Sequence, residues 1–187
     1  MKKMHKTVHP WHDLSPGENA PEIVTAFIEV PKNSMLKYEL DKDSGFIKLD
    51  RVLYSAVHYP GDYGFIPQTL SEDGDPTDII IISNFPVAPG IIMRARPVGV
   101  LEMIDGDERD EKIIAVPVDD PRFDKRKDIS DFSELVILEI KHFFETYKEL
   151  QGKTVEIKSI KGYWDAKEEI KKGIELYKKE YGLNSDE

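Results

Sequence analysis

Apolar and polar residues alternate along the first two thirds of the chain with the two-residue period of β-strands. In residues 23–30 this alternation places Glu29 at the end of a mostly apolar face. Residues 37–40 and 46–53 flank a segment rich in Asp, Ser and Gly, which predicts a β-hairpin with its turn at 41–45. Further strands are predicted at residues 79–82, 91–104 and 113–118.

From about residue 131 the apolar residues follow helical spacing instead. Asp131 stands three residues before Glu134, which predicts a helix start with a capping box. The apolar positions of this helix are Val136, Ile140, Phe143, Phe144 and Tyr147. A strand is predicted near residues 153–160, and a second helix is predicted to begin at Asp165, with an apolar face made of Ala166, Ile170, Ile174, Tyr177 and Tyr181.

This order of elements predicts an α+β fold. Several short strands followed by helix, strand and helix are typical of a small closed OB-like β-barrel with additional strands and two helices packed outside. We expect residues 1–187 to form a single domain. Within it, 1–11 would be a flexible N-terminal extension and 183–187 a loose C-terminal tail.

Composition excludes several classes of function. The chain has 36 acidic and 26 basic residues and a net charge of −10, and its basic residues are spread singly, so nucleic acid is not expected as a partner. It has no Cys, so a metal would bind through oxygen or imidazole. We find neither a run of about 20 apolar residues, as a membrane span needs, nor a secretory signal, and expect a soluble cytoplasmic protein without a membrane partner.

The most informative segment is the acidic loop Asp73-Gly74-Asp75-Pro76-Thr77-Asp78, just before a buried strand. Carboxylates this close repel one another and are stabilised by raised pKa values or by bound cations such as Mg²⁺, Mn²⁺ or Ca²⁺. A solvated surface turn is the alternative, slightly favoured for the loop taken alone. A helix-loop-helix calcium site does not fit, because Asp78 stands where that loop needs Gly and Asn84 where it needs Glu.

A second acidic segment, from Asp105 to Lys112, lies between two predicted strands and includes Asp110. Two such segments at one end of a barrel would share several divalent cations, and a site so rich in metal would need an anionic ligand. Cationic and phenolic side chains suited to holding one are Lys37, Arg51, Lys112, Lys148, Tyr63 and Tyr147. For each of these residues alone, a structural role is the better interpretation.

Taken together, these residues resemble the soluble family I inorganic pyrophosphatases of the prokaryotic type. The loop Asp73 to Ile79 is similar to that family's diagnostic motif, and the resemblance extends from about His12 to Tyr181. The supporting motifs are Ile28-Glu29-Val30-Pro31, Lys37-Tyr38-Glu39, Asp50-Arg51, Tyr59-Pro60-Gly61-Asp62-Tyr63-Gly64, Arg96-Pro97-Val98-Gly99, Ala115-Val116-Pro117, His142-Phe143-Phe144 and Tyr147-Lys148.

The resemblance implies a Mg²⁺-dependent inorganic diphosphatase, in which metal-activated water attacks pyrophosphate directly and two phosphates result. Asp75 would be the general base. The metal ligands would be Asp73, Asp78, Asp105 and Asp110; the substrate-binding residues Lys37, Arg51, Tyr63, Lys112, Tyr147 and Lys148; and the supporting cavity residues Glu29, Glu39 and Tyr59. Several Mg²⁺ ions would bind per site, with Mn²⁺, Zn²⁺ or Co²⁺ as substitutes.

Two positions depart from the family's pattern. Gly106 stands where bacterial members often carry a Glu, which bears on the surroundings of the Asp105 metal, and Asp107 is a candidate substitute. The resemblance also implies a homohexamer with contacts through the helix of His142, although a second His found in some members is Thr146 here.

Two other functions are compatible with parts of the pattern. The first is a β-barrel module that binds metal or phosphate but has lost catalysis, and a module of this kind would have no need of a base at Asp75. The second is a nucleic-acid-binding barrel, which conflicts with the net charge and with the lack of aromatic residues interleaved with basic ones.

Overall fold

The computed structural model describes residues 8–182. Within this range it contains a six-stranded sheet, a separate two-stranded sheet, two α-helices and three short 3-10 helices. The strands are β1 (Val24–Val30), β2 (Leu36–Leu40), β3 (Ile47–Val52), β4 (Asp62–Phe65), β5 (Asp78–Ile81), β6 (Ile92–Asp105), β7 (Glu108–Pro117) and β8 (Val155–Gly162). The helices are α1 (Glu134–Thr146) and α2 (Tyr163–Tyr181), and the 3-10 helices are Pro121–Phe123, Ile129–Asp131 and Glu149–Gln151.

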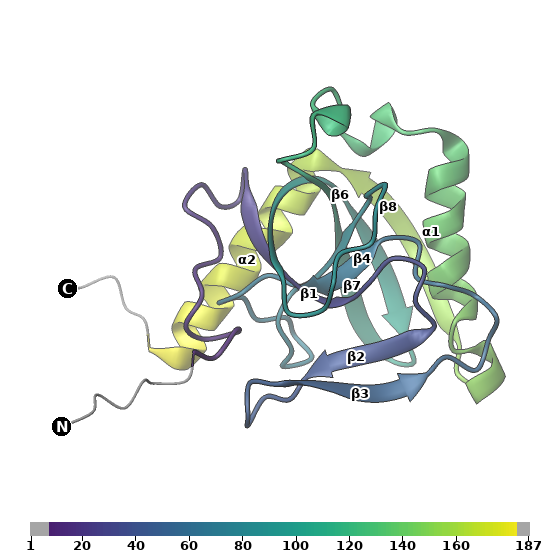
Figure 1. Cartoon of the computed structure of the whole chain (residues 1–187), viewed down its shortest axis with the longest axis horizontal. Helices are drawn as coiled ribbons and strands as arrows, with labels where there is room; N and C mark the ends of the chain where they lie inside the picture. Colours follow the sequence, from purple (N-terminus) through teal and green to yellow (C-terminus); the bar gives the residue numbers. More distant parts are fainter. Residues whose placement is uncertain (1–7, 183–187) are drawn as a thin grey trace.

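The six-stranded sheet is mixed and has the order β1-β4-β5-β7-β6-β8. Only the pairing of β5 with β7 is parallel among the described strands. The first strand, β1, also pairs with β6, so β1, β4, β5 and β7 each have two neighbours and β6 has three, namely β1, β7 and β8. Figure 1 shows β2 and β3 as a hairpin below this sheet and α1 and α2 on its two sides. The expected α+β class is thereby confirmed at the level of a mixed sheet with two helices.

The helices cover apolar clusters of the sheet. Ile140, Phe143 and Phe144 of α1 pack in one cluster with strand residues such as Ile80 and Leu101. Ala166 and Ile170 of α2 pack in another, made largely of β1, β5 and β7 side chains. The helical periodicities predicted for both segments therefore mark core-facing stripes, except that Tyr181 at the end of α2 is 46% exposed.

Both predicted helix starts were wrong by two to three residues. Asp131 does not cap α1, because its carboxylate is the N3 partner in a capping box formed by Asp128 on the preceding 3-10 helix. Helix α1 begins after Ser133, and α2 begins at Tyr163 after Gly162 rather than at Asp165. The spacing of Asp131 and Glu134 predicts a helix cap, but Asp131 is instead the last residue of the preceding 3-10 helix and takes part in the capping box of that helix.

The predicted N-terminal extension falls mainly outside the described residues, as does the C-terminal tail. Of the described part, Trp11 is buried and donates its indole N–H to the carbonyl of Thr69 at 2.9 Å. Trp11 packs in a third cluster with Phe27, Phe65 and Tyr177. The packed part of the chain therefore already includes Trp11.

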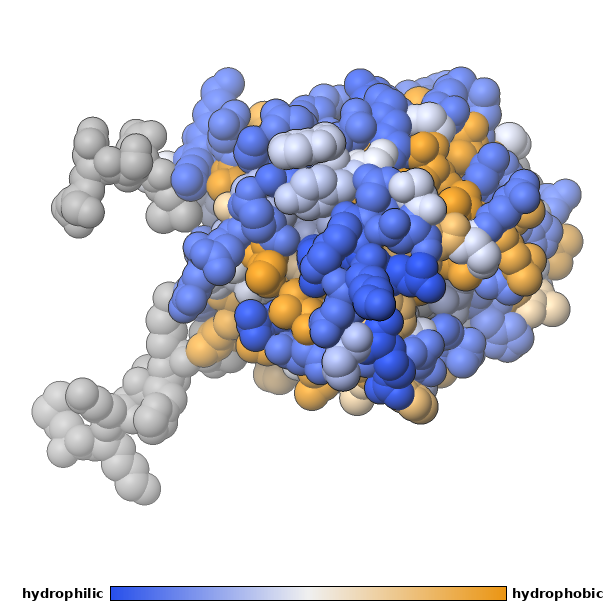
Figure 2. All heavy atoms as spheres, turned by 90° about the horizontal axis from the view of Figure 1, so that it is seen from above, coloured by the Kyte–Doolittle hydropathy of each residue, from blue (hydrophilic) through white to orange (hydrophobic). Residues whose placement is uncertain are grey.

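Hydrophilic side chains cover most of the face shown in Figure 2, with apolar patches between them. Neither helix in residues 8–182 is both long and apolar enough to cross a membrane.

Candidate active site

The parallel pairing of β5 with β7 brings two predicted metal ligands together. Asp78 is the first residue of β5 and lies opposite Lys112 of β7. Asp110 precedes Lys112 by two residues in the same strand, so both side chains leave the same face of the sheet. The Lys112 ammonium forms ion pairs with both carboxylates. The register of two strands thus fixes a buried cation between two acidic groups.

Burial makes this pairing electrostatically strong. It raises the pKa of Asp110 to about 6, with Asp78 adding to the rise and Lys112 opposing it. Burial also raises the pKa of Asp73. For Lys112, burial acts to lower the pKa, but the charges of Asp78 and Asp110 outweigh it and hold the pKa well above its usual value. Lys112 therefore stays an ammonium ion, and the acidic groups around it carry excess negative charge.

Asp73 and Asp75 lie in the loop that precedes β5. The carboxylate of Asp73 accepts the backbone N–H of Asp75 at 2.9 Å, and Gly74 between them has a positive φ of 84°. This tight turn separates the two carboxylates, because one is turned back onto the loop's own backbone. The other, Asp75, is about half exposed.

The β2–β3 hairpin carries the predicted cationic residues Lys37 and Arg51, which lie opposite each other in the two strands. Lys37 pairs with Glu39 on the same strand face, and Arg51 lies 3.3 Å from Asp50. The Nε of Arg51 is buried and has no hydrogen-bond partner among the described residues. A guanidinium with an unused donor is suited to receiving an anionic ligand.

Glu29 lies at the base of this region and is buried. Its Oε1 accepts the backbone N–H of Leu40 at 2.7 Å, which ties β1 to the end of β2. Burial raises the pKa of Glu29 to about 8, so the side chain is mostly a neutral acid at pH 7.

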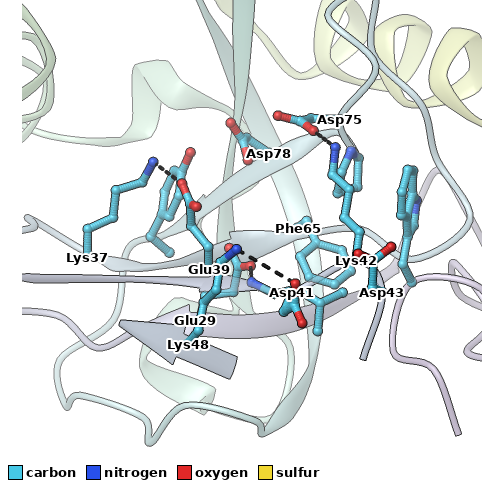
Figure 3. Close-up of a pocket in the computed structure, with 14 residues that line it drawn as sticks. Glu29, Lys37, Glu39, Asp41, Lys42, Asp43, Lys48, Phe65, Asp75 and Asp78 are labelled. Atoms are coloured by element: carbon cyan, nitrogen blue, oxygen red, sulfur yellow. Dashed lines mark hydrogen bonds and ion pairs between the residues drawn. The ribbon is translucent and has the colours of Figure 1, made fainter. Parts of the chain in front are cut away.

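A cavity of about 480 Å³ lies between the hairpin and the acidic loop. Figure 3 shows Lys37 and Glu39 facing it from the hairpin, with Asp75 and Asp78 on the opposite side. The predicted site residues that line it are Glu29, Lys37, Glu39, Tyr63, Asp75 and Asp78. Residues from four strands and one loop thus converge on a single cavity.

Tyr59 and Tyr63 support this cavity from the core. The ring of Tyr63 lies 5.9 Å below the Lys112 ammonium and 5.4 Å from the ring of Tyr59. Burial raises the pKa of both phenols well above the usual value, so both keep their protons near neutral pH.

Asp105, Tyr147 and Lys148 form a second group that does not line the cavity. The Lys148 ammonium pairs with Asp105 and lies 5.1 Å from the centroid of the Tyr147 ring. Asp105 instead lines a separate hollow of about 490 Å³ with Lys153 and Thr154. Burial raises the pKa of Tyr147, with the charges of Asp110, Asp105 and Asp78 adding to the rise and that of Lys112 opposing it.

The second acidic segment is not the loop that the sequence predicted. Strand β6 ends at Asp105 and β7 begins at Glu108, so Asp110 belongs to a strand, and only Gly106 and Asp107 form the turn. Gly106 has φ +67° and lies in open space. A Glu there would adopt a left-handed backbone conformation, so this departure from the family pattern suits the tight turn.

Among residues 8–182, no three acidic or histidine side chains converge as the ligands of one metal ion do. Lysine ammonium groups instead neutralise the carboxylates, with Lys112 between Asp78 and Asp110 and Lys148 at Asp105. Oxygen donors that require cationic compensation in this way suit Mg²⁺ or Mn²⁺. The donor set therefore fits divalent cations by its chemistry.

Sequence reasoning did not assign four charged residues that line the cavity, Asp41, Lys42, Asp43 and Lys48, and of these Lys42 contacts a predicted site residue. Lys42 lines the cavity, and its ammonium forms an ion pair with Asp75 (Figure 3). It belongs to the hairpin turn 41–45, which the sequence marked only by its turn-forming residues. A basic residue within that turn was the available signal, but the contact with Asp75 depends on how the hairpin folds over the loop.

In this cavity, carboxylates that require cations face cationic side chains. Such an arrangement is typical of proteins that bind phosphates together with divalent metals. The chain matches the family described as inorganic pyrophosphatase over residues 26–178. It therefore belongs to the inorganic pyrophosphatase family.

Individual relatives agree with this assignment. An inorganic pyrophosphatase of Aquifex pyrophilus is 54% identical over 172 residues, covering 90% of this chain and 97% of the relative. A soluble inorganic pyrophosphatase 2 of Chlamydomonas reinhardtii is 47% identical, covering 92% and 90%. The crystal structure of inorganic pyrophosphatase from Thermus thermophilus superimposes with a TM-score of 0.88 at 48% identity, covering 91% of this chain and 99% of that one.

Proposed function

We propose that the chain hydrolyses inorganic pyrophosphate to two phosphates at the cavity between the β2–β3 hairpin and the acidic loop. Membership of the inorganic pyrophosphatase family makes it a hydrolase of phosphoric anhydrides, an inorganic diphosphatase. The observation that carries the location is the cavity itself, where Lys37 faces Asp75 and Asp78 from a separate sheet. A multiply charged anion needs both cationic side chains and metal-binding carboxylates around it.

Asp73, Asp78, Asp105 and Asp110 are the residues that would hold the divalent cations, with Mg²⁺ as the preferred ion and Mn²⁺, Zn²⁺ or Co²⁺ as substitutes. Such cations, when bound, neutralise phosphate charge and lower the pKa of water. The raised pKa of Asp110, caused first by its burial, supports this assignment, because an added cation would favour its ionised form.

Asp75 is the proposed general base. Water attacks one phosphorus atom, its proton passes to the Asp75 carboxylate, and the bond from that phosphorus to the bridging oxygen breaks. The reaction needs no covalent intermediate on the protein. Asp75 suits this role because its carboxylate faces the cavity and is about half exposed, whereas Asp73 is bonded back to the loop.

The two phosphoryl groups would be held by Lys37, Arg51, Tyr63, Lys112, Tyr147 and Lys148. Arg51 has a free buried donor at Nε, and together with Lys148 it would stabilise charge on the departing phosphate. Burial raises the pKa of the Tyr63 and Tyr147 phenols, so each remains a hydrogen-bond donor near neutral pH. Glu29, Glu39 and Tyr59 would support the cavity without contacting the reacting atoms.

The proposal also covers the closed barrel, the single domain, the cellular compartment and the oligomeric state. The ring of pairings β1-β4-β5-β7-β6-β1 would form a closed OB-like barrel, and residues 1–187 a single catalytic domain. The protein would act in the cytoplasm as a homohexamer, without a nucleic-acid or membrane partner. The interface proposed for the hexamer includes the α1 helix with His142, which lines a hollow of about 460 Å³ with Glu139 and His58.

Phosphate release from pyrophosphate tests the proposal. With Mg²⁺ the intact protein should release phosphate, and a chelator should abolish the release. Asp75→Asn should lower kcat by a factor of about 10² to 10⁴, the usual contribution of a general base. Asp43→Asn is the matched control, because Asp43 also lines the cavity and has no proposed role.

The outcomes separate the alternatives. Binding of pyrophosphate without any Mg²⁺-dependent release would identify a binding module without catalysis and overturn the proposed activity. Full kcat in Asp75→Asn would show that another group is the base while leaving the activity itself intact.

A further inference from the structure

Lys42 lies at the tip of the β2–β3 hairpin and reaches across the cavity mouth. Its ammonium forms an ion pair with the carboxylate of Asp75 and lies 3.4 Å from the carbonyl oxygen of Gly74 (Figure 3). The contact joins the hairpin, which carries Lys37 and Arg51, to the acidic loop.

Exposure decides what this contact can do. The side chains of Lys42 and Asp75 are 50% and 54% exposed. Ion pairs this exposed add little to stability unless other contacts already hold their partners in place. A role for Lys42 therefore depends on how firmly its own position is fixed.

The N-terminal segment holds Lys42. The imidazole Nε2 of His9 lies 2.9 Å from the carbonyl oxygen of Lys42, and the Lys42 ammonium lies 5.5 Å from the centroid of the Trp11 ring. Trp11 is buried, and its indole N–H donates to the carbonyl of Thr69. Both the backbone and the side chain of Lys42 thus contact this segment.

Trp11 is also connected to the acidic loop through Thr69. The hydroxyl of Thr69 accepts the backbone N–H of Thr77 at 2.9 Å, next to Asp78. Trp11 is therefore connected through Thr69 to the loop and through the cation–π contact to Lys42. Trp11 thus contacts Lys42 directly and, through Thr69, the backbone of Thr77 two residues after Asp75, and this restriction lowers the entropy cost of forming the Lys42–Asp75 pair.

We propose that Lys42 is a positioning residue that orients the Asp75 carboxylate for proton acceptance. The inference rests on the proposed function, in which Asp75 is the base. Lys42 acts on catalysis through Asp75 and does not bind the phosphoryl groups, so its loss lowers kcat and leaves KM nearly unchanged.

The test compares Lys42→Gln with Lys48→Gln. Lys48 is a matched control on the same hairpin: it also lines the cavity, but it pairs with Asp41 at 3.7 Å. We expect Lys42→Gln to lower kcat about tenfold with KM changed less than about twofold, since small misplacements of a catalytic group are costly. Lys42→Arg should recover much of kcat, and Lys48→Gln should resemble the unsubstituted protein.

A double-mutant cycle shows whether Lys42 works through Asp75. In an Asp75→Asn background, adding Lys42→Gln should change kcat less than about twofold, because the carboxylate that Lys42 orients is gone. A full tenfold loss there, or a rise in KM with unchanged kcat in the single variant, would overturn the positioning role. Unchanged kcat and KM in Lys42→Gln would also overturn it. Failure of Asp75→Asn alone to lower kcat would refute the base assignment instead.

Discussion

The predicted metal ligands Asp78 and Asp110 stand on the six-stranded sheet, whereas Lys37 and Arg51 stand on the two-stranded β2–β3 hairpin. On the sheet, strand register and burial hold Lys112 between the two carboxylates, and Lys112 is only 4% exposed. On the hairpin, Arg51 is 26% exposed and keeps an unused donor. The sheet carboxylates are thus compensated by a buried ammonium, whereas the hairpin cations, which pair with Glu39 and Asp50, are more exposed to solvent and to a ligand.

This difference separates stability from binding. Charges buried on the sheet depend on one another, so removing one leaves its partners uncompensated in a medium of low polarity. Charges on the hairpin are partly solvated, so removing one is expected to weaken ligand binding more than folding.

Of the substitutions considered, replacing Lys112 on the sheet side should have the largest effect on the free energy of unfolding. Lys112→Met leaves the partly buried carboxylates of Asp78 and Asp110 without their shared ammonium, and should lower the free energy of unfolding in chelator by about 3 kcal/mol. Saturating Mg²⁺ should restore part of this loss, because a divalent cation neutralises the same carboxylates. Urea denaturation at one fixed protein concentration, with chelator and with Mg²⁺, measures both quantities.

Lys48→Met is the control for Lys112→Met. Lys48 is 55% exposed and its pair with Asp41 is long, so the change should stay within about 0.5 kcal/mol. Equal destabilisation of the two variants would contradict the proposed difference between the sheet and the hairpin.

Most strands and both helices were predictable because their periodicity reports burial directly, whereas β4 (Asp62–Phe65), which follows a Pro/Gly segment, was not predicted. The β2–β3 hairpin and the core-facing stripe of α1 follow from local pattern and turn chemistry. The position of Asp110 did not, because the acidic segment around it resembles a loop, and only pairing with β6 makes residues 108–112 a strand. The start of α1 was misjudged because a neighbouring 3-10 helix takes the carboxylate of Asp131.

The candidate site residues were chosen from motifs, but their pairings required the fold. Nothing local connects Asp78 with Lys112, which are brought together by a parallel register across 34 residues. Lys42 was missed for a similar reason: its partner Asp75 lies 33 residues away, and Trp11, which packs against Lys42, falls in a segment expected to be flexible.

Glu29 offers a smaller, pH-dependent test of the buried side. Its pKa is about 8 in the folded protein, against an ordinary value of 4.5. Between these values the folded state keeps a proton that the unfolded state has lost, so this group's contribution to stability falls as pH rises from about 4.5 to 8.

Glu29→Gln should remove that contribution while keeping an acceptor for the Leu40 N–H. Relative to the original protein, the variant should gain on the order of 2 kcal/mol in the free energy of unfolding between pH 5 and pH 6.5, and more by pH 8. Denaturation in chelator at pH 5, 6.5 and 8 measures the gain. A stability difference that stays constant with pH would show that Glu29 does not titrate in this range.

Arg51→Gln sharpens the comparison from the hairpin side, with the smallest effect on folding. Because one buried donor of Arg51 has no partner among the described residues, its removal should change the free energy of unfolding by less than about 1 kcal/mol. KM for pyrophosphate should rise about tenfold, since a charge-assisted contact to phosphate is lost. Steady-state kinetics and urea denaturation on the same preparation give both values, with Lys48→Gln as the hairpin control. A large loss of stability at unchanged KM would mean that the hairpin cations serve folding, and the division of the cavity into a compensated side and a binding side would then fail.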